Sequence, residues 1–269
     1  MTQPTQPTPA KAVAGDFCWS ELATRDVKGA LPFYTQLFGW TDREQAMPGT
    51  DAPYKMVLKD GVDIAGMYDM AGPHFEGVPP HWMNYILVDD VDAIAARVEP
   101  AGGKLLFPPM DIPDVGRMAA FADPEGATLS LFQEGARKGR PDMGAAHGAF
   151  CWGELYTNDP EKAIAFYKAV LPWDGHRKDD GPMPYTEWMV GERAVGGMIQ
   201  IAPEMGPVPP HWLTYIAVDD CDATVSKATE LGGSVMMPGM DIEGVGRFAL
   251  LQDPAGATFA VITLDPKHC

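Results

Sequence analysis

Two kinds of side chain that can transfer a proton occur twice along the chain, in matching surroundings. Glu21 and Glu154 lie in the segments FCWSEL and FCWGEL, and His81 and His211 both lie in the segment VPPHW. A carboxylate on the wall of a cavity can serve as a general base, and histidine titrates near neutral pH. These four residues are therefore the candidate catalytic residues.

Arginine recurs in the same way, in a form that suits anions. The segments MDIPDVGR and MDIEGVGR end at Arg117 and Arg247, and a guanidinium beside a cleft can hold an anion through two hydrogen bonds. Structural alternatives stay open. Instead of binding an anion, each arginine could pair with a carboxylate of the protein. For Arg117 that carboxylate would be Glu21 or Asp111. Each histidine is equally expected to bond a backbone carbonyl of its Pro-Pro turn.

These residues belong to a repeat that covers most of the chain. VPPHWMNYILVDD at 78–90 returns as VPPHWLTYIAVDD at 208–220, with ten of thirteen positions identical. Shorter matches follow the same spacing: FCWSEL at 17–22 and FCWGEL at 150–155, FY at 33–34 and 166–167, and Asp-Pro at 123–124 and 253–254. A period of about 130 residues indicates two copies of one unit.

Each half divides into two smaller modules with the order strand, helix, then two or three strands. After a strand at 17–24, Asp26 is a helix N-cap and Gly39 ends the helix. The turn Lys59-Asp60-Gly61 predicts a hairpin. The remaining elements of the first half are strands at 53–59, 62–69, 83–88, 104–107, 117–122 and 127–133, and a helix at 91–101.

Alternation along the first strand predicts which side chains share a face. Phe17, Trp19 and Glu21 are expected on one face, and Cys18 on the other, towards the helices. On this reading Cys18 and its counterpart Cys151 are core thiols.

With these motifs the chain resembles the vicinal oxygen chelate superfamily, which includes glyoxalase I, bleomycin- and fosfomycin-resistance proteins and extradiol dioxygenases. The resemblance rests on the stretch from Asp26 to Gly39 with its Phe33-Tyr34 pair, and on Asp123-Pro124-x-Gly126 before the last strand. It implies an α+β fold of four βαβββ modules, arranged as two glyoxalase-like domains with cupped mixed sheets. The expected boundaries are a disordered tail at 1–14, domains at 15–134 and 148–265, and a linker at 135–147.

Family members that use a metal place histidine, glutamate or glutamine on the first and last strands of the modules. By resemblance, these positions fall on Trp19, Met83, Ala65 or Gly66, and Ser130, and in the second half on Trp152, Leu213, Gly196 or Gly197, and Ala260. Tryptophan is no metal ligand and methionine suits only soft ions. We therefore expect neither a metal nor another cofactor. The alternative is a metal-dependent glyoxalase or dioxygenase whose ligands lie elsewhere.

Aromatic and apolar residues at the ligand positions predict a cavity for a planar or apolar small molecule. The expected substrate-binding residues are Trp19, Met83, Tyr85, Arg117, Ser130, Trp152, Tyr215 and Arg247. The expected function is binding of a small organic molecule, as a metal-independent lyase, isomerase or hydrolase. One alternative is a resistance-type protein that sequesters its ligand without chemistry. Another is that the two tryptophans only fill space. The two halves differ at one equivalent position, Ser130 in the first and Ala260 in the second. The sequence therefore leaves open whether both cavities are functional.

Charge and targeting signals narrow the expected partners. With 20 Lys and Arg against 37 Asp and Glu, the net charge of −17 argues against nucleic acid and anionic membranes. The N-terminal MTQPTQPTPAKAVAG has no signal-peptide pattern, so a cytoplasmic location with reduced cysteines is expected. The expected partner is a small-molecule ligand or substrate, bound by a monomer or homodimer.

The sequence leaves open whether the first module pairs with the second or with the fourth.

Overall fold

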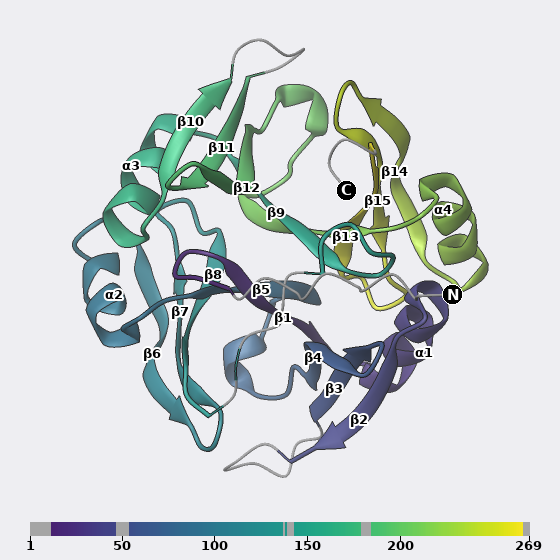
Figure 1. Ribbon diagram of the computed structural model, residues 1–269, viewed down its shortest axis with the longest axis horizontal. Coiled ribbons are helices and arrows are strands. Elements are labelled where there is room, and N and C mark those ends of the chain that lie inside the picture. The colour runs from purple at the N-terminus through teal and green to yellow at the C-terminus, as the bar shows by residue number, and fades with distance from the viewer. Residues whose placement is uncertain (1–11, 47–53, 137, 139–142, 179–183, 266–269) are drawn as a thin grey trace, which may run out of the picture.

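The structure is a computed structural model that describes residues 12–46, 54–136, 138, 143–178 and 184–265. Within these ranges the chain forms two eight-stranded sheets flanked by four α-helices (Figure 1). Residues 1–11 of the predicted tail, part of the predicted linker and Cys269 lie outside the described residues. None of the described helices is long and apolar enough to cross a membrane.

The first domain contains β1 to β8 and the second β9 to β16. The elements of the first are β1 (Phe17–Thr24), α1 (Val27–Phe38), β2 (Thr41–Gln45), β3 (Tyr54–Lys59), β4 (Val62–Asp69), the 3-10 turn η1 (Pro73–Phe75), β5 (His81–Leu87), α2 (Val91–Val98), β6 (Lys104–Ile112), β7 (Gly116–Ala122) and β8 (Thr128–Glu134). Those of the second are β9 (Phe150–Thr157), α3 (Pro160–Val170), β10 (Asp174–Lys178), β11 (Tyr185–Val190), β12 (Arg193–Gln200), η2 (Pro203–Met205), β13 (His211–Ala217), α4 (Cys221–Glu230), β14 (Ser234–Ile242), β15 (Gly246–Gln252) and β16 (Thr258–Leu264).

Both sheets have the same strand order, which confirms the predicted α+β fold of four βαβββ modules. The first sheet runs β2-β3-β4-β1-β5-β8-β7-β6 and the second β10-β11-β12-β9-β13-β16-β15-β14. The first strands of two consecutive modules, β1 and β5, pair antiparallel in the middle of the sheet. The edge strands β2 and β10 are not predicted from the sequence, because their residues TDREQ and DGHRK show no apolar alternation.

The predicted helix and turn signals are confirmed. Asp26 caps α1 by accepting a hydrogen bond from the Gly29 amide, and Gly39 ends that helix in the left-handed region at φ 68°. Between β3 and β4, Asp60 and Gly61 both adopt positive φ, 51° and 81°, as a two-residue hairpin turn requires.

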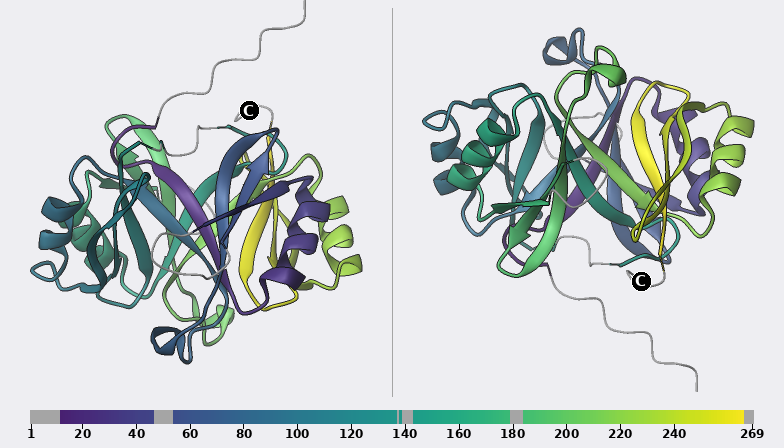
Figure 2. Two further views of the ribbon diagram at one scale, coloured as in Figure 1. Left: turned by 90° about the horizontal axis from the view of Figure 1, so that it is seen from below. Right: turned by 90° about the horizontal axis from the view of Figure 1, so that it is seen from above.

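The helices pack between the two domains. Helix α1 lies beside α4, and α2 lies beside α3, at opposite ends of the molecule (Figures 1 and 2). One apolar core joins α1 and β4 to β15, β16 and α4, and a second joins α2, β7 and β8 to α3 and its strands. The first module therefore shares its sheet with the second module and its helical core with the fourth. The two pairings that the sequence left open both occur.

Two buried hydrogen bonds, one donated by each domain to the other, stabilise these cores. Tyr34 on α1 donates its hydroxyl to Asp253 of the second domain at 3.1 Å, and Tyr167 on α3 donates to Asp123 of the first at 3.1 Å. Each hydroxyl also accepts a bond from a tryptophan indole, 2.9 Å from Trp82 to Tyr34 and 2.8 Å from Trp212 to Tyr167. The Phe-Tyr and Asp-Pro motifs of the sequence thus contact each other across the domain interface.

The centres of the two sheets also meet on their helix-covered sides. Ser20 donates to Asn84 at 2.8 Å, and Asn84 donates to Thr214 of the second domain at 2.8 Å, all three side chains being buried. The opposite side of each sheet is called its free face below. The helices and the central contact occupy the side of each sheet opposite its free face.

One predicted face assignment is wrong. Phe17 packs against Trp173 and Trp212 in the interdomain core, while Cys18 packs with Tyr85 and Phe132, in the cluster that includes Trp19. Cys151 likewise packs with the free-face cluster of the second domain. The cause in the first domain is an irregularity in the pairing of β1 with β5 between Phe17 and Trp19. Such a bulge shifts the alternation by one residue.

Loss of the Tyr34 hydroxyl is expected to destabilise the fold. Tyr34→Phe leaves the buried Trp82 indole and Asp253 carboxylate short of a partner each, which costs about 1–3 kcal/mol per group. Tyr167→Phe is expected to behave alike, because its surroundings are the same. Urea unfolding measures both variants. Gln36→Ala, at an exposed position on α1, is the control and is expected to stay within about 0.5 kcal/mol of wild type. Equal stability of Tyr34→Phe and the control would contradict this reading.

Candidate functional site

Glu21 lies at the centre of the free face of the first sheet. Its two carboxylate oxygens accept hydrogen bonds from the hydroxyls of Tyr54 on β3, at 2.6 Å, and Tyr85 on β5, at 2.5 Å. The pairing of strands places Met83 beside Glu21, and Tyr85 beside Trp19. The predicted residues Glu21, Trp19, Met83 and Tyr85 therefore come together on one wall.

The second sheet repeats this arrangement around Glu154. Tyr215 donates to one carboxylate oxygen at 2.8 Å and Tyr185 to the other at 2.9 Å. Trp152 donates its indole N–H to the Tyr185 hydroxyl at 3.0 Å. The repeated motifs predict Tyr215 and Trp152 at this site, but they predict neither Tyr185 nor Tyr54. No short-range pattern marks these two tyrosines, because they reach the glutamate from two strands away.

A third tyrosine stands near each carboxylate, on different strands in the two domains. In the first domain it is Tyr68 on β4, whose strand partner is Ala23 on β1. In the second it is Tyr156 on β9, whose partner is Ile199 on β12. In the equivalent cross-strand pair, the tyrosine thus lies on the fourth strand of the first domain and on the first strand of the second domain. Burial raises the pKa of the Tyr68 and Tyr156 hydroxyls, and the negative charge of the nearby glutamate raises it further.

Burial controls the ionisation of both glutamates. Removal from water raises the pKa of the Glu21 and Glu154 carboxyls above the usual 4.5, and the hydrogen bonds from tyrosine oppose this in part. Burial and the adjacent glutamate raise the pKa of Tyr85 and Tyr215 well above 10, so both tyrosines remain donors. A carboxyl group with a raised pKa can hold or release a proton closer to neutral pH.

Two glycines make room for the tyrosine hydroxyls. Gly66 pairs with Glu21 and Gly197 with Glu154. A Cβ atom at Gly66 would lie 1.8 Å from the Tyr54 hydroxyl, and one at Gly197 would lie 1.8 Å from the Tyr185 hydroxyl. Any side chain at these positions would displace the tyrosine. The tyrosine hydroxyl therefore takes the place that a glutamate would need there.

These residues do not fit a divalent metal. Around Glu21 the positions at which family members carry ligands hold Trp19, Met83, Gly66 and Ser130, which leaves one carboxylate already bonded to two tyrosines. Mg²⁺, Mn²⁺, Fe²⁺ and Zn²⁺ require several oxygen or nitrogen donors. Among the described residues, no group of three or more His, Cys, Asp or Glu side chains is close enough to hold a metal.

Each of the two candidate histidines lies on a free face, and one nitrogen of each ring is hydrogen-bonded to the backbone. His81 Nδ1 is 2.9 Å from the Pro79 carbonyl oxygen, and His211 Nδ1 is 2.8 Å from that of Pro209. Since a carbonyl only accepts, Nδ1 carries the proton and Nε2 keeps its lone pair in the neutral ring. Burial lowers the pKa of both histidines. The backbone-bonded alternative is therefore correct, and it leaves Nε2 as an acceptor. The His211 ring also stacks on Tyr156, with 4.8 Å between ring centroids.

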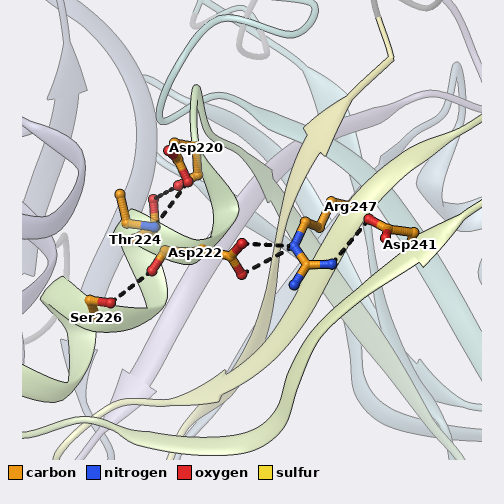
Figure 3. Close-up of polar contacts among 7 residues, drawn as sticks. Asp220, Asp222, Thr224, Ser226, Asp241 and Arg247 are labelled. Atoms are coloured by element: carbon orange, nitrogen blue, oxygen red, sulfur yellow. Dashed lines mark hydrogen bonds and ion pairs between the residues drawn. The ribbon is translucent and has the colours of Figure 1, made fainter.

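The two candidate arginines point to the other side of the sheet. Arg247 binds Asp222 at the start of α4, at 3.0 Å, and Asp241 on β14, at 3.0 Å (Figure 3). Arg117 contacts Asp92 on α2 and Asp111 on β6 in the same way. The aspartate-pairing alternative thus describes both. The structure does not bring either arginine to the glutamate clusters. Arg117 also borders a surface hollow lined by residues 111–117 and 133–136.

Removal of a tyrosine donor is expected to raise the pKa of its glutamate further. Tyr54→Phe deletes one bond to the Glu21 carboxylate, and that bond favours the charged form. Gly66→Ala is expected to act in the same direction, because it displaces the Tyr54 hydroxyl. The pH titration of the Glu Cδ signal by ¹³C NMR measures the shift, and Tyr185→Phe, in the other domain, is the control. A lower Glu21 pKa in Tyr54→Phe would contradict this geometry.

Glu154→Gln is expected to flatten the pH dependence of stability. The folded protein holds the Glu154 proton more tightly than the unfolded chain, so the free energy of unfolding falls as pH rises from 4.5 through the raised pKa. Glutamine has no such charge, so the stability of the variant relative to wild type improves from pH 4 to pH 8. Urea unfolding at both pH values measures this. Asp123 and Asp253 titrate in the same direction and remain in the variant. A variant that loses more stability at pH 8 than at pH 4 would contradict the assignment.

Comparisons with known proteins agree with the fold and the repeat. The family model of the Glyoxalase/Bleomycin resistance protein/Dioxygenase superfamily matches residues 17–131, and that of the Glyoxalase-like domain matches residues 153–262. The Mn(II)-bound glyoxalase from Novosphingobium aromaticivorans superposes with a TM-score of 0.64 at 17% identity, over 94% of this chain and 83% of that chain. At this identity the match supports the fold alone.

Two curated relatives match nearly the whole chain. "Putative glyoxylase CFP32" of Mycobacterium bovis is 40% identical over 251 residues, which cover 93% of this chain and 95% of the relative. "Anthracycline biosynthesis protein DauV" of Streptomyces sp. (strain C5) is 37% identical over 260 residues, 91% of this chain and 92% of the relative. The chain therefore belongs to the glyoxalase/bleomycin resistance protein/dioxygenase superfamily.

Proposed function

We propose that the chain binds a small, planar, largely apolar organic molecule on a free face, and that the glutamate there exchanges a proton with it. One observation carries the proposal: a carboxyl group with a raised pKa stands in an aromatic wall, held by two tyrosine hydroxyls. Such a group suits the proton transfers of an isomerase or lyase. No step depends on a metal.

The surroundings of the carboxylate favour a planar ligand that carries a hydroxyl group. Trp19 and Tyr85 offer ring faces and edges, and Met83 adapts to apolar shapes. A carboxylate has about four acceptor sites. The two tyrosines fill one on each oxygen, and the Trp19 side chain also donates to Glu21, which leaves one site. A phenol or enol of the ligand can therefore donate to Glu21. The relative named for anthracycline biosynthesis is in keeping with this shape, since anthracyclines contain planar fused rings.

A second candidate function is sequestration without chemistry. It is favoured by the same hydrogen bonds, because a carboxylate that already accepts from two tyrosines is satisfied as a structural group. The two functions differ in what the glutamate does after binding. Binding alone requires the aromatic wall, whereas turnover requires an ionisable carboxyl group.

The first test is binding of 1,4-dihydroxyanthraquinone, followed by quenching of tryptophan fluorescence. Wild type is expected to bind it, and Trp19→Leu/Trp152→Leu is expected to weaken binding at least about tenfold, which corresponds to about 1.4 kcal/mol. Circular dichroism checks that the variant is folded. A Lys28→Ala variant, on the exposed part of α1, is the control. No binding by folded wild type would contradict the proposed ligand class.

The second test separates catalysis from sequestration. Native mass spectrometry of protein purified without added ligand identifies a retained molecule, which is then used as the substrate. If the glutamates transfer a proton, Glu21→Gln/Glu154→Gln retains binding and loses turnover by at least about a hundredfold, as removal of a general base does. Turnover that survives this double substitution would remove the glutamates from the mechanism.

A further inference from the structure

The two free faces share one plan, yet the two glutamate residues differ in exposure. Glu21 is half-buried, whereas Glu154 is only 7% exposed. The residue that pairs with each glutamate on the adjacent strand differs in exposure in the same direction. Met83 beside Glu21 is half-buried, and Leu213 beside Glu154 is 2% exposed. The hydrogen bond from Tyr85 to Glu21 is part-buried, whereas the one from Tyr215 to Glu154 is buried, so burial separates the two sites.

An aromatic ring packs beside the second site. Phe248 on β15 is 6% exposed, and its ring lies 6.1 Å, between centroids, from Tyr215, the tyrosine that bonds Glu154. The corresponding position on β7 is Met118, which is half-buried. Methionine is unbranched and flexible and yields to a ligand more easily than a packed phenyl ring does.

The third tyrosine closes the second site further. Tyr156 is 7% exposed and stacks on His211, with an angle of 17° between the rings. In the first domain the position of Tyr156 is taken by Ala23, and the third tyrosine, Tyr68, is directed to Phe75 of η1, with 6.1 Å between centroids. Beside His81 the first domain therefore has a fully buried alanine, where the second domain has a tyrosine ring stacked on His211.

The edge of the first site offers exposed apolar surface. Phe107 and Met110 on β6 pair with Ala120 and Met118 on β7, and they are 37% and 47% exposed. In the second domain Met240 is similarly exposed, at 49%, but it pairs with the buried Phe248. Val235 and Met236 on β14 are exposed as well, at 39% and 57%. Among the described residues, the two edges differ in what lies next to them: a half-buried methionine and glutamate in the first domain, and the buried Phe248 and Glu154 in the second.

We propose that the first domain alone carries the ligand site, and that the second domain is a closed copy whose Glu154 supports the fold. This inference rests on the proposed function. The first site takes a neutral planar molecule with a phenol or enol group. That hydroxyl meets Glu21, and the rings lie along Met83 and Met118 towards the β6 edge. Glu21 is then the proton-exchanging residue, and Glu154 has no contact with ligand.

Exchanging the covering residues tests the proposal. Met83→Leu/Met118→Phe gives the first site the residues of the second, and Leu213→Met/Phe248→Met is the matched exchange in the second domain. Wild type is expected to bind one 1,4-dihydroxyanthraquinone per chain by isothermal titration calorimetry. The first exchange is expected to weaken that site at least about tenfold, and the matched exchange is expected to leave it within about twofold. Thermal unfolding checks that both variants are folded.

Carboxyl labelling tests the same proposal without substitutions. Carbodiimide with glycine methyl ester, followed by peptide mass spectrometry, is expected to modify Glu21 at least about tenfold faster than Glu154, because unequal exposure limits attack. Bound 1,4-dihydroxyanthraquinone is expected to protect Glu21 only. Equal labelling, two equivalent binding sites, or loss of binding only in the second-domain exchange would overturn this inference while the proposed function survives. No binding at all would overturn both.

Discussion

The hydroxyl groups of Tyr34 and Tyr167 each connect one domain to the other, and the position of the free faces depends on them. Each tyrosine accepts from a tryptophan of its own domain and donates to an aspartate of the partner domain. That aspartate also closes the turn before the last strand, since Asp123 Oδ1 accepts the amides of Glu125 and Ala127. The tyrosine, tryptophan and aspartate side chains of this network are all buried, so it tolerates no unpaired member among them. Helix, turn and domain interface are therefore set by one network.

This network decides which side of each sheet is available to a ligand. With the helices packed in pairs between the domains, the helix-covered sides of the sheets are sealed, down to the central contact of Asn84 with Thr214. The arginines follow the same division: Arg117 and Arg247 reach the first turns of α2 and α4 and are held there by aspartates. Glu21 and Glu154 lie on the opposite side. A carboxylate and a guanidinium that looked like partners in the sequence are thus separated by the thickness of a sheet.

The sequence predicted the repeat, the α+β modules and most of the candidate wall, but it missed what holds the glutamates. Repeated motifs identify equivalent positions whatever their structure, which is why Trp19, Glu21, Met83 and Tyr85 were found together. Strand alternation failed at Phe17 and Cys18, because a bulge shifts the pattern and leaves no mark in the residue types. Tyr54 and Tyr185 were missed for another reason. They reach the glutamate only because glycine occupies the strand between, a relation among three strands that no single segment contains.

The comparison of the two halves shows which features a buried glutamate requires and which are free to change. Both copies keep the two donor tyrosines and the glycine beneath them, because a buried carboxylate without donors is costly. The third tyrosine lies on β4 in one half and on β9 in the other, in equivalent cross-strand pairs. That exchange conserves an aromatic ring near the carboxylate while it changes what the ring covers. The two halves therefore keep the same hydrogen bonds to the glutamate and differ in the residues packed around it.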